Sequence, residues 1–265
     1  MGETIKIRNI TFGAGIPKIC VPITGRTQEE ILQTARETGL WNCDAVEWRA
    51  DLYEDHLNME SFRDMFQKLS KEFRACSPEK ITLFTVRTAS DGGAEIPRKD
   101  YMRMNLYAVG KADLIDIEYR AGETVVRDFV QKAQEAGSRV IVSFHDFSKT
   151  PSEEDLVALM RNMQKTGADL VKVAVMPQTE EDVDRLMRAT RAMKENYARV
   201  PLITMSMGAI GRRSRVRGES FGSVMTFASV KEASAPGQIE LEQLRRELTE
   251  FHKVLTVLGP LRGYK

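Results

Sequence analysis

The sequence has few residues that commonly bind metals or form disulfides. Its 265 residues include three cysteines and three histidines, scattered along the chain. An odd number of cysteines without a CxxC pair argues against a disulfide framework and a structural zinc site. The histidines lack HExxH and HxH spacing, which argues against a metal hydrolase. We therefore interpret Cys20, Cys43 and Cys76 as reduced thiols in a hydrophobic core, and we expect no metal.

Long apolar runs and an excess of one charge are also missing. No run approaches the roughly 18 apolar residues of a membrane-spanning helix, and the start MGETIKIRNI has no signal-peptide core. The 39 basic and 38 acidic residues leave a formal net charge of +1. No global field therefore favours nucleic acid or an anionic membrane. We expect a cytoplasmic protein whose attraction for anions is local.

Eight short runs rich in β-branched and apolar residues recur along the chain, with helical stretches between them. This alternation is typical of parallel strands joined by crossover helices. The runs are 18–23, 45–49, 81–87, 114–118, 139–144, 170–175, 201–206 and 223–227. Eight such units in a chain of about 250 residues predict an α/β fold, the closed (β/α)₈ or TIM barrel.

The remaining segments fit a single domain. Residues 4–12 alternate like a pair of strands and end at Gly13, which predicts an N-terminal β-hairpin that closes the bottom of the barrel. No linker, repeat or low-complexity segment divides the chain. We therefore expect residues 1–265 to form one catalytic barrel.

Three helix starts are marked by a hydroxyl residue three positions before an acid, the pattern of a capping box. The pairs are Thr27 with Glu30, Thr150 with Glu153, and Thr179 with Asp182. We expect each threonine to cap the N-terminus of a helix.

Charged residues share one face of several predicted strands. Because successive side chains of a strand point to opposite faces, Glu47, Arg49 and Lys172 each lie opposite apolar neighbours. The same pattern holds for Asp116, Glu118, Ser143 and His145, and Arg87 ends its strand. If the apolar faces pack against the helices, these polar groups point into the barrel. Active sites of such barrels lie at the C-terminal ends of the strands, so we expect the site there.

Lys172 is the residue that we expect to react covalently. A buried ammonium without a partner is shifted toward the neutral amine. A neutral amine attacks a ketone, and the resulting iminium acidifies the neighbouring carbon. His145, at the end of the preceding strand, is a suitable proton carrier because imidazole titrates near neutrality.

Structural explanations of these residues remain open at this stage. A lysine in a strand is commonly an edge residue that extends its ammonium into solvent. The pairs Glu47 with Arg49, and Arg87 with Asp116, are equally well explained as ion pairs that only stabilise the barrel.

Two loops after the last strands complete the expected mouth. Residues 211–217 carry four arginines, one of which could hold a substrate anion bidentately. A solvated basic loop or a nucleic-acid patch is the alternative. Residues 234–238, SAPGQ, suit a flexible lid.

Six motifs, in order along the chain, together resemble the type I 3-dehydroquinate dehydratases, a family of shikimate-pathway lyases. They are EWRAD at 47–51, FTVRT at 84–88, SFHDF at 143–147, KVAVMP at 172–177, TMSMG at 204–208 and ASAPGQ at 233–238. The resemblance implies a homodimeric barrel that converts 3-dehydroquinate, a small molecule, to 3-dehydroshikimate and water without metal or organic cofactor. It also implies a role in aromatic amino-acid biosynthesis.

The resemblance further implies roles for individual residues. Lys172 matches the Schiff-base lysine, His145 matches the general acid/base, and Asp91 matches the carboxylate beside that histidine. The residues matching substrate-binding groups are Glu47, Arg49, Arg87, Arg215, Ser234 and Gln238. Among them, Arg215 would clamp the substrate carboxylate, while Ser234 and Gln238 would close the loop over the ring.

Two positions depart from the family pattern. Asp91 stands where the family has a glutamate before the Gly-Gly of the loop after the third strand. We expect its shorter side chain to reach about one methylene less far toward His145. Pro22 replaces a serine that contacts substrate in many members, which removes a hydroxyl from the end of the first strand.

Two other functions stay open from the residues alone. A class I aldolase or transaldolase shares the barrel and the lysine but cleaves a carbon–carbon bond, and it usually binds phosphate after strands seven and eight. Gly208 and Gly211 leave such a site open. A non-catalytic binding barrel, or a nucleic-acid binder using residues 212–217, would show no turnover.

Overall fold

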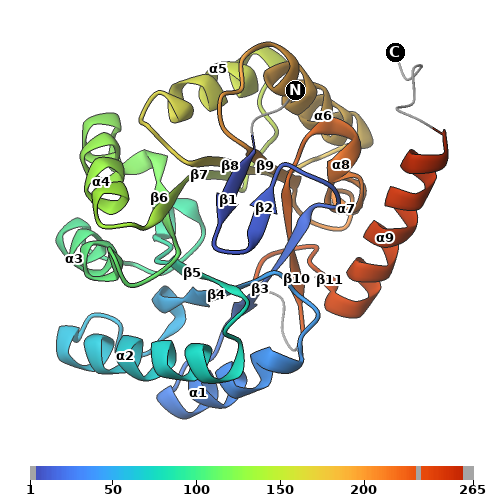
Figure 1. Cartoon of the computed structure of the whole chain (residues 1–265). Coiled ribbons are helices and arrows are strands. Elements are labelled where there is room, and N and C mark those ends of the chain that lie inside the picture. Colours follow the sequence, from blue (N-terminus) through green and yellow to red (C-terminus); the bar gives the residue numbers. More distant parts are fainter. Residues whose placement is uncertain (1–3, 231–233, 259–265) are drawn as a thin grey trace.

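The chain forms a ring of parallel strands surrounded by helices, with a two-stranded hairpin across one end (Figure 1). The structure is a computed structural model, and it describes residues 4–230 and 234–258. The predicted (β/α)₈ barrel with an N-terminal hairpin is confirmed. No helix in these residues is long and apolar enough to cross a lipid bilayer.

Eight strands form the ring in chain order. They are β3 (Lys18–Ile23), β4 (Ala45–Arg49), β5 (Ile81–Thr85), β6 (Leu114–Glu118), β7 (Arg139–Asp146), β8 (Leu170–Val175), β9 (Leu202–Ser206) and β10 (Met225–Ser229). The predicted bounds are correct for β3, β4, β6 and β8 and lie within two residues for the others. A short strand that was not predicted, β11 (Ile239–Glu240), lies parallel to β10.

The ring closes between β9 and β10 through a side chain. β10 pairs with β3 along a regular ladder, whereas β9 meets the residues just before β10 at a single bridge, between Leu202 and Ser223. There the hydroxyl of Ser223 accepts from the Thr204 amide at 2.9 Å and donates to the Thr204 carbonyl at 3.0 Å. One serine therefore supplies backbone hydrogen bonds where the sheet ladder is short.

Helices cover the outside of the ring and connect successive strands (Figure 1). They are α1 (Gln28–Glu37), α2 (Met59–Cys76), α3 (Arg98–Ala108), α4 (Glu123–Glu135), α5 (Glu153–Gln164), α6 (Glu180–Asn196), α7 (Arg212–Val216), α8 (Gly218–Phe221) and α9 (Leu241–Leu258). Single 3₁₀ turns are η1 (Thr38–Leu40), η2 (Ala50–Leu52), η3 (Ala89–Asp91) and η4 (Tyr119–Ala121).

Two of the three predicted helix caps are confirmed. Thr27 and Thr179 each form a complete capping box, at α1 and α6. The prediction for Thr150 is wrong, because Ser152 caps α5 by accepting from the Asp155 amide. The Thr150 hydroxyl instead donates to the carbonyl of Met176 at 3.1 Å.

Two apolar layers line the ring of strands, one on its outer face and one on its inner face. The outward-facing strand residues, such as Val46, Trp48 and Val173, pack against the helices. The inward-facing residues near the strand beginnings form a second cluster, which Ile7 and Phe12 from β1 (Ile5–Ile7) and β2 (Ile10–Phe12) join. The predicted strand faces are therefore correct. Apolar side chains fill the lower barrel, so the inward polar groups gather at the other end.

Candidate active site

One cavity at the C-terminal ends of the strands brings together all nine residues that the sequence analysis assigned to a site. They are Glu47, Arg49, Arg87, Asp91, His145, Lys172, Arg215, Ser234 and Gln238. Apolar side chains of Phe147, Met205, Met207 and Phe227 complete much of the wall. Pro22 is buried in β3, paired with Glu47 of β4, and does not line this cavity.

Lys172 lies inside the barrel and is ion-paired. Its side-chain nitrogen, Nζ, lies 3.3 Å from Oδ2 of Asp116 and 4.4 Å from the centre of the Phe227 ring. Only 5% of the residue is exposed, so it is not an edge residue that extends into solvent. Its partner Asp116, which was not anticipated, projects inward from β6, two strands away in the sheet.

Asp116 is the acceptor for three side chains. Its Oδ1 lies 2.9 Å from the Arg87 guanidinium and accepts from the Ser143 hydroxyl at 2.5 Å, while Oδ2 faces Lys172. Burial disfavours the Asp116 carboxylate, but the charges of Arg87 and Lys172 outweigh burial and hold its pKa below the ordinary value. The predicted pair of Arg87 with Asp116 is therefore present, and Asp116 is negatively charged.

The other predicted ion pair, Glu47 with Arg49, is not formed. Arg49 donates from Nε and Nη2 to the two oxygens of Asp51, at 2.9 and 2.7 Å. Glu47 instead accepts from the Thr85 hydroxyl at 2.7 Å. Asp51 also accepts from the backbone amide of Arg87 at 3.1 Å, so it joins the ends of β4 and β5. Asp51 lies in the EWRAD motif, but no role was predicted for it.

Asp91 contacts His145 despite its short side chain. Oδ2 of Asp91 lies 3.1 Å from both Nδ1 and the backbone nitrogen of His145. Its other oxygen accepts from Nε of Arg120 at 2.8 Å. Arg120, which was not predicted, also donates to the His145 carbonyl at 3.3 Å and lies 4.4 Å over the Phe144 ring. The carboxylate of Asp91 is therefore within hydrogen-bonding distance of the His145 ring.

Two glycines allow the turn that carries Asp91 to come this close. Gly92 has a φ of +85°, and a Cβ there would overlap the ring of Phe147. A Cβ on Gly93 would overlap the carbonyl of Arg87. The Gly93 amide donates to the Thr88 carbonyl at 2.8 Å, which holds the turn against the end of β5. Both positions therefore require glycine.

His145 is electrostatically kept neutral. Burial, together with the charges of Arg87 and Lys172, lowers the pKa of His145 well below its ordinary value. Because Asp91 accepts at Nδ1, the neutral ring carries its proton there and keeps the lone pair on Nε2. Burial raises the pKa of Asp91, although Arg87 and Arg120 oppose this effect. A neutral imidazole in this tautomer can accept a proton through Nε2.

Arg215 is the one cation of this cavity without a carboxylate partner in the part of the chain that the structure describes. Its guanidinium donates to the Pro236 carbonyl at 3.0 Å and lies 3.5 Å from the Met205 sulfur, while Nε has no partner. Only 1% of the residue is exposed, and burial lowers the pKa of Arg215 to about 10. A buried cation without a counterion is costly, so this position favours an anionic ligand.

The loop with the predicted lid residues lies against the cavity. Ser234 and Gln238 exchange two hydrogen bonds, backbone amide to Oε1 and Nε2 to hydroxyl, both at 2.9 Å. The Gly208 amide, after β9, donates to the Pro236 carbonyl at 3.1 Å. Ala233 of the ASAPGQ motif lies outside the described residues. Within the described ranges, no cluster of three or more His, Cys, Asp or Glu is arranged to hold a metal ion.

Comparison with known sequences points to one family. A family model described as "Type I 3-dehydroquinase" matches residues 19–254. The 3-dehydroquinate dehydratase of Syntrophotalea carbinolica is 42% identical over 252 residues, which cover 94% of this chain and 98% of that protein. The 3-dehydroquinate dehydratase of Bacillus licheniformis is 43% identical over 258 residues, covering 96% and 100%.

Solved structures similar to this chain belong to the same family. The type I 3-dehydroquinate dehydratase of Clostridium difficile, solved with covalently modified comenic acid, has a TM-score of 0.89 at 41% identity. The match covers 96% of this chain and all of that one. The enzyme of Enterococcus faecalis has a TM-score of 0.85 at 37% identity, covering 93% and 99%.

The titration of His145 tests the electrostatics of the site. We expect its ring to remain neutral below the ordinary histidine pKa of about 6.5. Since the unfolded state then binds more protons, the contribution of His145 to stability falls as the pH drops below about 6.5. Lys172→Met removes one opposing charge and should raise the pKa of His145, as measured by ¹⁵N NMR of the ring nitrogens. The exposed Lys149→Met is the matched control, and an equal titration in both variants would contradict the coupling.

Proposed function

The chain belongs to the type I 3-dehydroquinase family, and from this premise we propose that it dehydrates 3-dehydroquinate through an imine on Lys172. It is a carbon–oxygen lyase, so the aldolase and the non-catalytic barrel are set aside. The observation that carries the assignment of residues is one buried cavity lined by Lys172, a neutral His145 and an unpaired Arg215. The covalently modified comenic acid in the Clostridium difficile structure is consistent with covalent chemistry in this family.

Arg215 binds the carboxylate of the substrate in this proposal. Its guanidinium is buried, lacks a counterion and presents a planar donor fork that matches a carboxylate. Glu47, Arg49 and Arg87 contact the remaining polar groups of the ring, because each lines the cavity with its orientation fixed by a neighbour. Arg49 is held by Asp51, so its position does not depend on the ligand.

The imine forms in two steps. His145 takes a proton from the Lys172 ammonium, and the neutral Nζ then adds to the ketone carbon to give a carbinolamine, which loses water to give the iminium. His145 relays the protons of both steps, and its ring is neutral beforehand, so the lone pair of Nε2 is free to accept the first one. Phe227 and Met205 line the same cavity and reduce the access of bulk water to the imine.

Elimination of the β-hydroxyl then proceeds from the iminium. His145 removes the α-proton, and the electron pair moves into the iminium to give an enamine. The enamine returns its electrons and expels the β-hydroxyl, which His145 protonates so that it leaves as water. Hydrolysis of the iminium consumes the water released earlier and frees Lys172, so that one molecule of water is produced in each turnover.

Asp91 and Arg120 act as positioning residues in this scheme. Asp91 accepts from Nδ1 and so directs the lone pair of Nε2 to the substrate. Arg120 holds the other carboxylate oxygen and the His145 carbonyl. We also propose that the protein is a homodimer, as the family resemblance implies. From the sequence pattern we further propose that it is cytoplasmic and that residues 1–265 form one barrel domain.

Reductive trapping tests the covalent step. Borohydride added during turnover reduces an iminium to a stable amine, so we expect a substrate-derived mass on the peptide that contains Lys172. Lys172→Met should give no adduct, whereas the exposed Lys165→Met should give the wild-type adduct. If the trapped mass lay on another peptide, or were absent, the proposed nucleophile would be wrong.

Replacing His145 separates imine formation from elimination. His145→Ala should lower turnover by about 10² to 10⁴, because one group that transfers protons in several steps is lost. Trapping on Lys172 should remain measurable, since the amine is retained. The control is His252→Ala on α9, whose ring contacts Glu219 far from the cavity. Unchanged turnover in His145→Ala would show that the proton carrier lies elsewhere.

The role of Arg215 is tested by the kcat/KM of a variant that lacks its charge. Arg215→Gln should lower kcat/KM for 3-dehydroquinate by roughly 10- to 100-fold, since hydrogen bonds to charged groups contribute about 1.5–3 kcal/mol. Arg213→Gln is the control, because Arg213 pairs with Asp184 and Glu180 on the outside. Similar kcat/KM values for the two variants would show that Arg215 does not bind the substrate carboxylate.

A further inference from the structure

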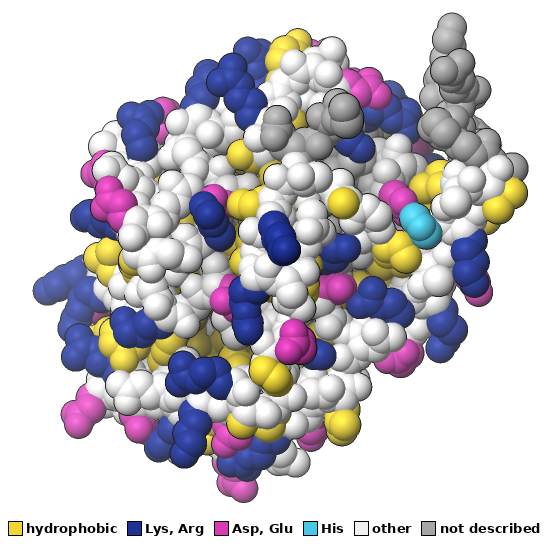
Figure 2. Space-filling view, in the orientation of Figure 1, with side chains coloured by type: hydrophobic (Ala, Val, Ile, Leu, Met, Phe, Trp, Pro, Cys, Tyr) yellow, Lys and Arg dark blue, Asp and Glu magenta, His cyan; other side chains and the backbone are white. Residues whose placement is uncertain are grey.

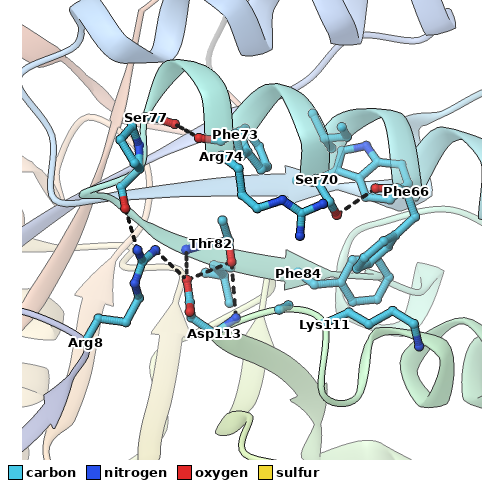
Figure 3. A pocket seen from close by; sticks show the side chains of 15 residues that line it. Arg8, Phe66, Ser70, Phe73, Arg74, Ser77, Thr82, Phe84, Lys111 and Asp113 are labelled. Carbon is cyan, nitrogen blue, oxygen red and sulfur yellow. Dashed lines mark hydrogen bonds and ion pairs between the residues drawn. The ribbon is translucent and has the colours of Figure 1, made fainter.

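A larger cavity lies outside the barrel, on the side of β5 that faces α2. It has a volume of about 280 Å³ and shares no lining residue with the candidate active site. Figure 3 shows Ser70 and Arg74 of α2 on one side of it, and Thr82 and Phe84 of β5 on the other. The segment 111–113, which leads into β6, completes the wall together with Arg8 of the hairpin. No step of the proposed reaction uses this cavity.

The floor of this outer cavity is aromatic. Phe66, Phe73 and Phe84 line it with Trp48, and each is less than 7% exposed. The rings of Phe66 and Phe84 lie 5.5 Å apart between centroids, and those of Trp48 and Phe84 lie 5.7 Å apart. A dry cavity of about 150 Å³ is enough to bind benzene. The outer cavity therefore has room for one aromatic ring with a short substituent.

The rim of the outer cavity is positively charged. Arg8 lies 3.5 Å from Asp113, so these two charges offset each other. Arg74 and Lys111 remain, and among the residues that the structure describes neither forms an ion pair. Lys111 Nζ donates to the Tyr107 carbonyl at 2.7 Å and lies 4.4 Å over the Tyr107 ring. On this face, Figure 2 shows hydrophobic side chains between α2 and α3 with Lys and Arg side chains beside them.

We propose that the outer cavity is a binding site for a small planar aromatic carboxylate. The ring of the ligand packs against Phe66 and Phe84, where aromatic pairs gain energy beyond the area they bury. The carboxylate meets the unpaired guanidinium of Arg74, which Figure 3 shows extended along α2 over the cavity. An aliphatic anion lacks the ring contacts and a neutral ring leaves Arg74 unpaired, so both features are needed. The site does not depend on the proposed catalytic chemistry.

Binding of 4-methylbenzoate tests this proposal. In a Trp41→Phe background, Trp48 is the only tryptophan left, so its fluorescence reports ligand in the outer cavity, and calorimetry gives the affinity. We expect 4-methylbenzoate to bind and to change the Trp48 signal. 4-Methylbenzamide and cyclohexanecarboxylate should each bind at least about tenfold more weakly, as should 4-methylbenzoate to the exposed Arg74→Gln variant. Arg63→Gln, on the same helix but not lining the cavity, is the matched control and should bind normally.

A further variant distinguishes binding in the outer cavity from binding in the candidate active site. Arg215→Gln removes the cation expected to attract carboxylates there, and it should leave the Trp48 signal and its affinity unchanged. Loss of the signal in Arg215→Gln, or its retention with full affinity in Arg74→Gln, would assign the binding to the barrel mouth and overturn the proposal. Absence of binding by 4-methylbenzoate to the unaltered chain would also overturn it.

Discussion

The buried carboxylate of Asp116 is the charge on which the barrel mouth depends. It lies among Arg87, Ser143 and Lys172, which belong to three other parts of the ring. Without it, Lys172 would lose its carboxylate partner, and Arg87 would keep only Glu118 and Asp91, at 3.4 and 3.9 Å. Because this pairing uses Arg87 and Lys172, and Asp51 uses Arg49, Arg215 is left without a carboxylate. This unpaired guanidinium is the group that we propose binds the anionic substrate.

The same cluster sets the state of His145. Two nearby cations and burial favour its neutral ring, while Asp91 fixes which nitrogen carries the proton. Asp91 in turn depends on the two following glycines, which let its turn approach, and on Arg120, which holds its second oxygen. An aspartate at this position therefore contacts His145.

Sequence periodicity was sufficient to predict the strands and which of their residues face inward, because a barrel interior imposes strict alternation on every strand. It also identified the inward position of Lys172 and His145. It left ion pairs as one possible explanation: the pair of Arg87 with Asp116 is present, whereas Arg49 pairs with Asp51 and not with Glu47. The pairing of Lys172 with Asp116 was not anticipated, since partners on different strands depend on the stagger of the sheet. The EWRAD motif carried only a weak indication that Asp51 pairs with Arg49, namely an acid two residues after an arginine. Arg120 carried none, because it lies in a turn whose direction depends on the fold.

The most direct test of this account is a double-mutant cycle between Asp116 and Lys172, measured by urea unfolding. Asp116→Asn alone should be strongly destabilising, by about 3–5 kcal/mol, because it leaves a buried ammonium unpaired. In a Lys172→Met background the same change should cost at least about 1 kcal/mol less, since that charge is absent. Strictly additive costs would contradict the account, because they would mean that Asp116 does not hold the lysine.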